Sequence, residues 1–289
     1  MADLSEAAVR LIAFAGIFAA MALGERLIPR RAAHPARGAR WFTNLGMLIV
    51  DSLVLRVVFP AAAVGVALYA QMRGIGLFNA LEIAPIIAGA VSVVVLDLAI
   101  WAAHVASHKW PWLWRVHKVH HSDVDLDVTS ALRFHPVEIL ISMAWKGVVV
   151  LALGAPPLAV LVFEIILNGA AMFNHANLRL PLSLDRVLRY VVVTPDMHRI
   201  HHSVHMRETD SNYGFNLAIW DRLFGTYTEE PQDGQTGMTI GLSQYQSPAP
   251  TRLLWSLALP FRRAERNAAE GQGSTGGSQP ENGSTGKAR

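Results

Sequence analysis

Long apolar runs separated by short polar segments fill the first part of the chain. The first run covers residues 9–28, the second residues 45–70 and the third residues 85–108. Each run is long enough to cross a hydrocarbon core, which needs about 20 residues of α-helix. The second run contains charged residues, and we expect a kink in it at Pro60. The pattern therefore predicts three membrane-spanning helices.

The apolar pattern returns over residues 138–173, but the sequence Gly-Ala-Pro-Pro at residues 154–157 interrupts it. Glycine and proline together end helices, so we interpret this stretch as a hairpin of two helices that enters and leaves the membrane on one side. A single long span is the alternative.

Positive charge is distributed unevenly between the loops. Residues 26–40 hold five arginines, whereas the loop after the second run offers only Arg73. The positive-inside rule places the Arg-rich loop in the cytoplasm. The third helix then runs inward, and we expect its last residues to reach the cytoplasmic face of a bacterial-type inner membrane.

The composition agrees with a polytopic membrane protein. Hydrophobic residues make up 52% of the chain, charged residues 16%, and the mean hydropathy is +0.30. The absence of cysteine excludes disulfides, thiolate zinc sites and iron-sulfur clusters, so any metal must be held by nitrogen or oxygen. The net charge is only +3 and arginines cluster beside apolar runs, which argues against a nucleic-acid partner.

Histidines are concentrated in one part of the chain, because eleven of the twelve lie between His104 and His205. The first pair, His104 and His108, has the spacing HxxxH, which places both rings on one helix face about one turn apart. Two HxxHH boxes follow, and His175 stands alone after the apolar hairpin. The candidate metal ligands are His104, His108, His117, His120, His121, His175, His198, His201 and His202. Nine imidazoles exceed the coordination shell of one metal, so we predict two metal ions.

Other polar residues near these boxes are candidates for supporting the ligands. Asp97 lies seven residues before the first histidine of the HxxxH pair, on the same helix face but about 10 Å deeper. We expect Asp97, His135, Asn177 and Asp196 to hold ligands in place without binding metal. The acidic residues Asp123, Asp125 and Asp127 either orient the rings of the first HxxHH box or face solvent.

Spacing alone leaves the metal open, because all-nitrogen ligation suits zinc, copper, nickel or iron. A zinc hydrolase is one alternative, but the first box reads HVASH and lacks the glutamate of HExxH proteases. A metal-binding or transport protein without catalytic activity is another, although it would favour exchangeable carboxylates within the spans.

The boxes and their linking phrases resemble one known family. The order HxxxH, HxxHH, NHANL and HxxHH, with the phrases WLWRVHKVHHSD, TPDMHRIHHS and NYGFNLAIWDRLFGTY, is similar to the fatty acid hydroxylase and sterol desaturase superfamily. The likeness covers residues 97–227. It implies that the nine histidines hold two irons, which use O2 to hydroxylate or desaturate a C–H bond of a sterol-like, fatty acyl or isoprenoid lipid. It also implies a separate electron-transfer protein, of ferredoxin or cytochrome type.

One departure concerns the third box, which has one histidine and a nearby asparagine. Asn177 could therefore hold a water molecule at one iron. We expect apolar walls from the third span and the hairpin, including Trp101 and Trp145, to hold the lipid.

The expected fold is all-α, with polytopic membrane helices and a cytoplasmic helical cap that carries the two metals. We divide the chain into N-terminal transmembrane helices (1–96), a catalytic domain (97–230), an interfacial segment (231–263) and a disordered tail (264–289). The oligomeric state does not follow from these patterns.

Overall fold

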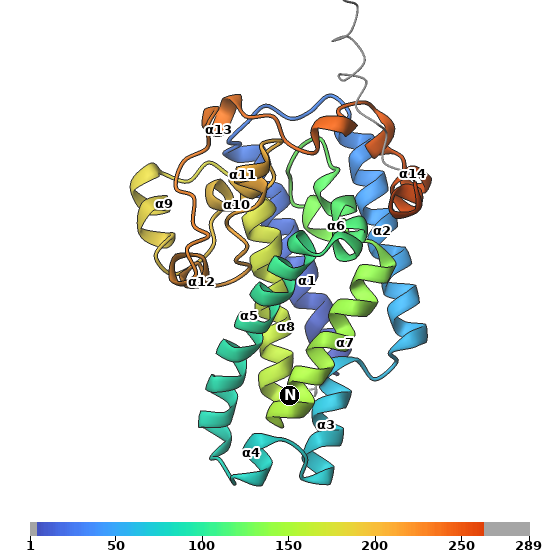
Figure 1. The fold of residues 1–289 in the computed structure, drawn as a ribbon, viewed down its shortest axis with the longest axis vertical. Coiled ribbons are helices and arrows are strands. Elements are labelled where there is room, and N and C mark those ends of the chain that lie inside the picture. Colours follow the sequence, from blue (N-terminus) through green and yellow to red (C-terminus); the bar gives the residue numbers. More distant parts are fainter. Residues whose placement is uncertain (1–4, 263–289) are drawn as a thin grey trace, which may run out of the picture.

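The computed structural model describes residues 5–262, and in this part of the chain every regular element is a helix, with only isolated β-bridges besides. Figure 1 shows a stem of long helices and, at one end, a cap of short helices and loops. The predicted all-helical fold is confirmed. The proposed tail at 264–289 lies outside the described residues.

Between residues 5 and 262, five segments are long and apolar enough to cross a membrane, which agrees with an integral membrane protein. They are α1 (Glu6–Leu27), the segment Arg37–Ala80 with α2 (Arg37–Val58), α3 (Ala62–Arg73) and α4 (Leu77–Ala80), α5 (Pro85–Lys109), α7 (Pro136–Leu153) and α8 (Pro157–His175). Large apolar side chains on the outside of this stem stay exposed: 82% for Val57, 81% for Ile86 and 70% for Leu158. Such surfaces are stable in lipid and would be costly in water.

The cap contains the remaining helices. They are α6 (Pro111–His121), α9 (Leu182–Leu188), α10 (Pro195–His201), α11 (Met206–Thr209), α12 (Ile219–Leu223), α13 (Gly234–Gly237) and α14 (Leu253–Ala258). Proline begins α5, α6, α7, α8 and α10, because its missing N–H would have no partner inside the first turn.

The second apolar run is broken as well as kinked. α2 ends at Val58 and α3 starts at Ala62, so Pro60 lies in the break between them, consistent with its missing hydrogen-bond donor. α2 also begins eight residues before the apolar run. Its first turns carry Arg40 and Asn44, which are fully buried in the cap.

The predicted hairpin is present, and the single long span is excluded. α7 ends at Gly154, which adopts a left-handed conformation with φ 66°, and α8 begins at Pro157. A side chain at Gly154 would meet the backbone of Ile75 at 2.8 Å, so glycine is required on both grounds. The two helices run antiparallel and return the chain to the cap end (Figure 1).

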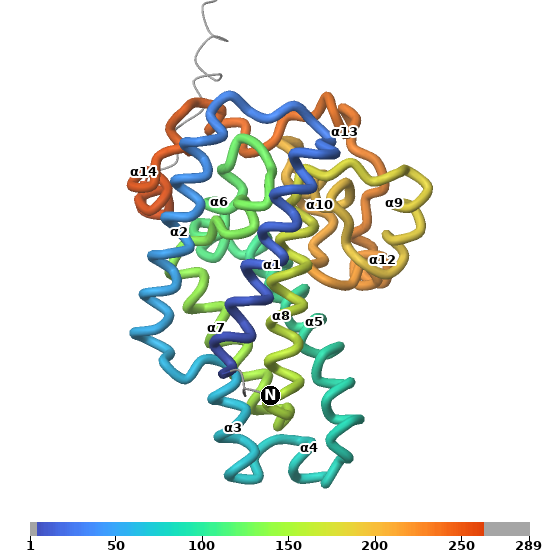
Figure 2. The backbone as a smooth tube through the Cα atoms, turned by 180° about the vertical axis from the view of Figure 1, so that it is seen from behind, coloured from blue at the N-terminus to red at the C-terminus, as the bar shows by residue number. Residues whose placement is uncertain are grey.

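The Arg-rich loop between α1 and α2 crosses the cap end of the molecule, as Figure 2 shows from behind. It therefore lies at the same end of the stem as the histidine-bearing helices. This agrees with the topology inferred from charge, and the assignment of that end to the cytoplasm stays a prediction.

The aspartates after the first HxxHH box bind an arginine. Arg40 donates to Asp123 at 2.6 and 2.9 Å and to Asp127 at 2.7 Å. Burial alone would raise the pKa of Asp123, but Arg40 and Arg133 lower it well below its ordinary value. The aspartates neither orient the histidine rings nor face solvent, so both expectations were wrong. They are buried because the buried guanidinium of Arg40 needs acceptors, which they supply. The pairing fixes α2 to the cap.

The C-terminal helix α14 packs against α2 and α6 together with Met47, Val119 and Leu259. Its outer face leaves Leu254 80% exposed. That arrangement suits a helix at a membrane surface, and contact with lipid stays a prediction.

Candidate metal centre

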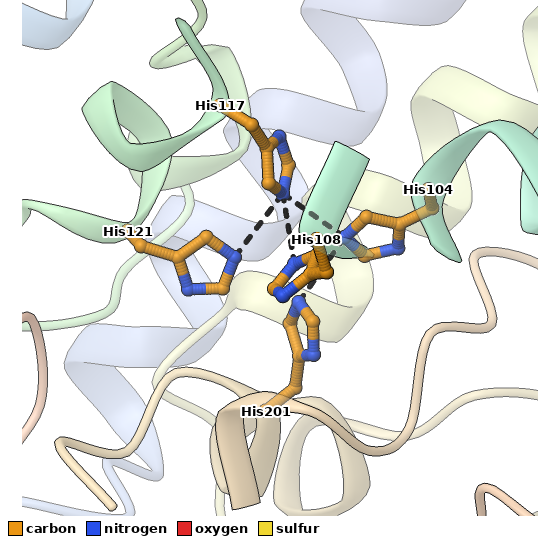
Figure 3. A group of neighbouring side chains, drawn as sticks. All are labelled: His104, His108, His117, His121 and His201. Atoms are coloured by element: carbon orange, nitrogen blue, oxygen red, sulfur yellow. Dashed lines mark hydrogen bonds between the residues drawn. The ribbon is translucent and has the colours of Figure 1, made fainter. Parts of the chain in front are cut away.

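Nine histidine rings from four segments converge where the stem meets the cap. They form two groups, and within each group the candidate ligand atoms lie within 4.8 Å of one another. The members are His104, His108, His117, His121 and His201 in the first group (Figure 3), and His120, His175, His198 and His202 in the second. The structure thus brings together all nine histidines singled out by spacing.

Adjacent histidines of each HxxHH box belong to different groups. His120 and His121 at the end of α6 are divided in this way, and so are His201 and His202 at the end of α10. The reason is helix geometry, because adjacent residues point about 100° apart while residues four apart share a face. Each box therefore contributes to both groups and holds them side by side.

The hydrogen bonds of the first group leave lone pairs facing each other. Nδ1 of His104 lies 2.7 Å from the carbonyl oxygen of Tyr213, and Nδ1 of His201 lies 2.7 Å from that of Ser211. A carbonyl oxygen only accepts, so both Nδ1 atoms carry the hydrogen. In neutral rings, the two Nε2 atoms, 3.1 Å apart, then have no hydrogen to share. A cation between them would relieve their repulsion.

The second group has the same arrangement. Nδ1 of His120 donates to the carbonyl oxygen of Arg133 at 3.2 Å, and Nδ1 of His175 lies 2.8 Å from the carbonyl oxygen of Ala171 and 2.7 Å from Oδ1 of Asn174. The Nε2 atoms of the two histidines lie 3.1 Å apart. They too present lone pairs to a common point.

The distances between ring nitrogens also fit metal ligation. Nε2 of His117 lies 3.2 Å from that of His104, and Nε2 of His198 lies 3.3 Å from those of His175 and His202. Two nitrogens bound to one metal at about 2.1 Å are roughly 3.0–3.4 Å apart at ordinary coordination angles. The residues present therefore fit two metal ions.

The rings in the cap are held in the neutral form that metal binding requires. Burial lowers the pKa of His201 to about 3. Burial, followed by repulsion between the rings, lowers the pKa well below its ordinary value for His120, His121, His198 and His202. At neutral pH these rings are uncharged, which supports the lone-pair argument.

Two carboxylates lie beside the first group and were not predicted. Glu138 accepts a hydrogen bond from Nδ1 of His117 at 2.6 Å. Oδ1 of Asp210 lies 3.6 Å from Nδ1 of His108, too far for a good hydrogen bond. No motif marks either residue. A glutamate in the first turn of an apolar helix is nevertheless a signal, because such residues in membrane helices usually have a functional partner.

The polar residues predicted to support the rings lie elsewhere. Within residues 5–262, none of the four has a hydrogen bond to any of the nine histidines. Asp97 accepts from the indole of Trp220 at 2.7 Å, and His135 caps α7 and contacts the carbonyl oxygen of Leu257 at 3.2 Å. Both residues connect the stem to the cap.

The remaining two support the Arg-rich loop. The Asn177 amide accepts from the backbone N–H of Arg31 at 3.0 Å and donates to its carbonyl oxygen at 2.9 Å. Asp196 pairs with Arg30 at 2.9 Å and with Arg199. Both polar ends of the Asn177 amide bond the backbone of Arg31, which directs this side chain to the Arg-rich loop.

A cavity of about 400 Å³ opens beside the first histidine group, and His104 and His117 form part of its wall. The apolar lining residues are Leu55, Ala62, Ile100, Ala103, Ala131, Phe134, Ile139, Met143, Leu167, Ala171 and Phe215. Within the described residues, no ring of the second group lines this cavity. An apolar ligand in the cavity would therefore lie against the first group.

The third span and the hairpin contribute much of the cavity wall, as expected, but the two tryptophans named for it do not line the cavity. Trp101 stacks on Phe224 with centroids 4.5 Å apart and donates to Asp221 at 3.1 Å. Trp145 is 42% exposed and donates to the carbonyl oxygen of Ala99. Their indole N–H groups direct them to polar partners outside the cavity.

Comparison with known proteins identifies the same segment. Residues 89–226 match the model of the fatty acid hydroxylase family. The chain is 32% identical to the ornithine lipid hydroxylase of Rhizobium tropici over 182 residues, which is 62% of this chain and 52% of that protein. No solved structure matches.

Two animal proteins are also similar. The chain is 31% identical to the alkylglycerol monooxygenase of Xenopus tropicalis, over 52% of this chain and 33% of that protein. It is 28% identical to the cholesterol 25-hydroxylase of Rattus norvegicus, over 47% of this chain and 45% of that protein. The chain thus spans about half or less of the length of these relatives.

Proposed function

Because residues 89–226 of this chain belong to the fatty acid hydroxylase family, we propose that the protein is a membrane-bound di-iron oxygenase that hydroxylates a C–H bond of a lipid. The overall reaction consumes the lipid, O2, two electrons and two protons, and yields the hydroxylated lipid and water. The relatives are by name hydroxylases and monooxygenases of ornithine lipid, alkylglycerol and cholesterol.

One observation carries this proposal: two rings of the group of five, His104 and His117, form part of the wall of a largely apolar cavity in the stem. Two irons held by the nine histidines would supply the activation of O2. The protein itself supplies the apolar part of the cavity wall beside His104 and His117, which would limit the water that could quench a strong oxidant.

The lining residues would position one carbon of the lipid beside His104 and His117. Burial of the chain against Ile100, Ile139 and Met143 contributes about 0.8 kcal/mol per CH2 group. The carboxylate of Glu138 holds the His117 ring in one tautomer and orientation, as acidic partners of metal-binding histidines generally do.

The remaining assignments follow from this reaction. Electrons come from a separate electron-transfer protein, as the resemblance to the family implies. The cap faces the cytoplasm of an inner membrane, and residues 97–230 form the catalytic domain. The N-terminal helices complete it, because Arg10 and Leu55 line the cavity. Desaturation is the second candidate activity, and the geometry of the cavity fits either reaction.

The test is comparative lipidomics of a strain that lacks the gene and of the same strain with the gene restored, grown under 18O2. We expect one lipid class to gain a hydroxyl group with the heavy oxygen only when the gene is present. A product that gains oxygen from water, or a lipid that is cleaved, would support the zinc hydrolase and overturn the oxygenase.

A further inference from the structure

Three charged side chains meet at the end of the cavity away from the histidines. Glu164 on α8 accepts from Arg10 on α1 at 2.6 Å and also pairs with Lys146 on α7. All three residues line the cavity of about 400 Å³ that reaches His104 and His117. We call Arg10, Lys146 and Glu164 the charged triad.

The triad lies deep in the stem. Glu138, which bonds His117, and Lys146 both line the cavity from α7, eight positions apart, or roughly 12 Å along the helix axis. On α8, Glu164 precedes His175 by eleven positions, or roughly 16 Å. The charges therefore lie well inside the apolar part of two candidate spans, where ionised groups are costly and usually functional.

A purely structural salt bridge would not need this arrangement. The side chain of Glu164 is 6% exposed and accepts from two cations, one with each carboxylate oxygen. Glu6 also pairs with Arg10 at 2.8 Å, but it is 44% exposed and so better solvated. Inside the cavity, two cations thus face one buried carboxylate.

Hydrogen-bond donors are left over at this point. An ammonium group has three donors and a guanidinium five. Within residues 5–262, Glu164 is the only recorded partner of Lys146, and Arg10 pairs only with Glu6 and Glu164. The remaining N–H groups of both cations can therefore donate hydrogen bonds to a ligand in the cavity.

The triad can also be reached from the outer surface of the stem. A second hollow of about 430 Å³ lies between α1, α2 and α8, and Arg10 lines both hollows. Its remaining lining is largely apolar, including Leu11, Phe14 and Ile17. A lipid could therefore bring a polar group to Arg10 without crossing the cap.

We propose that the charged triad is a binding subsite for a hydrogen-bond-accepting group of the lipid, with a carboxylate favoured over a hydroxyl or carbonyl. Binding at the triad does not depend on the proposed function. Only the oxidation of the lipid at the histidine end of the cavity rests on it. If both hold, the substrate carries a polar acceptor roughly 12 Å from the carbon that is oxidised, with an apolar stretch between. A plain hydrocarbon tail would leave the donors of Lys146 unpaired.

The experiment measures binding, so it does not depend on turnover. The full chain in detergent is titrated with radiolabelled dodecanoic acid, 1-dodecanol and dodecane, and the same titrations are made with Lys146→Met and Lys146→Arg. We expect Lys146→Met to weaken the binding of dodecanoic acid about tenfold, since one charge-assisted hydrogen bond is lost, and the binding of dodecane less than twofold. Lys146→Arg keeps the charge and should restore most of the affinity.

Arg56→Met is the matched control, because Arg56 is an exposed cation of α2 that does not line the cavity. It should bind all three probes as the parent does. Equal binding of dodecanoic acid by the parent and by Lys146→Met would overturn the subsite, as would an equal loss for all three probes, which would indicate a structural role. A binding result as expected in a protein that never hydroxylates lipid would reject the proposed function and keep the subsite.

Discussion

The two histidine groups contain the same type of residue but have different surroundings. The group of five shares a wall with the apolar cavity and has carboxylates behind it, Glu138 at 2.6 Å from His117 and Asp210 at 3.6 Å from His108. The group of four is buried, and the Nδ1 partners of two of its rings, His120 and His175, are carbonyl and amide oxygens.

The difference indicates a division of roles. The group of five is positioned to meet the lipid, and its acidic partners add negative charge that favours a cation. Within the described residues, no ring of the group of four lines the cavity itself, although His120 stacks on Phe134 of the cavity wall with centroids 4.6 Å apart. Since each HxxHH box contributes to both groups, the groups lie side by side, but they share no ligand.

The largest effect should come from removing one ring of either group. His201→Ala in the group of five and His120→Ala in the group of four are each expected to abolish product formation, because two cooperating metals need both sites. The measurement is hydroxylated lipid by mass spectrometry. His205→Ala, at a half-exposed ring outside both groups, is the control and should retain activity. Full activity in either variant would count heavily against the metal assignment.

The second largest effect should come from filling the cavity, which is lined by rings of the group of five but not of the group of four. Ala103 lines the cavity beside His104, whereas its neighbour Ala102 is exposed on the outside of α5. We expect Ala103→Phe to lower turnover about a hundredfold by displacing the lipid, with bound metal unchanged, and Ala102→Phe to be nearly silent. Turnover and metal content are measured on the same preparation. Equal turnover in both variants would place the lipid elsewhere.

A smaller effect should follow from changing the partners of the rings. Glu138→Gln keeps an acceptor for His117 but removes the negative charge, and we expect metal affinity at the group of five to fall about tenfold. Asn174→Ala removes a neutral partner of His175 and should cost less. Competition with a chelator reports both affinities. If Asn174→Ala loses more metal than Glu138→Gln, the neutral partner matters more than the acidic one, contrary to the account.

The smallest effect is that of pH on the metal-free protein. The pKa of His201 is about 3 in the fold and about 6.5 in an unfolded chain, so between these values the unfolded state binds a proton that the folded state does not. The contribution of this ring to stability is therefore constant above pH 6.5 and falls below it, by about 1.4 kcal/mol per pH unit. Thermal unfolding of chelator-treated protein between pH 7.5 and 5 measures the slope. A flat profile would mean that the ring is protonated when folded.

Much of the arrangement could be predicted from sequence. Spacing identified the nine histidines, because helix periodicity makes HxxxH and HxxHH patterns point to common faces, and the Gly154 to Pro157 break identified the hairpin. Helix geometry separates the adjacent rings of each box, but which rings of different segments share a group could not be predicted, since it depends on how the helices pack against each other.

The supporting residues were the least predictable part. Asp97 and Asp196 stand near the boxes in sequence, yet their carboxylates pair with Trp220 and Arg30 instead of a histidine. Glu138 lies 21 residues from His117 and reaches it only because α7 begins beside α6. Contacts between distant segments follow from tertiary packing, which local patterns do not encode.

The most direct test of the two-group arrangement is the number of metal ions per chain in the parent protein, His120→Ala and His201→Ala, purified in mild detergent and measured by elemental analysis. We predict about two irons in the parent and about one in each variant, because each substitution removes a ligand from a different group. A single zinc in the parent, or two irons retained in both variants, would contradict the assignment.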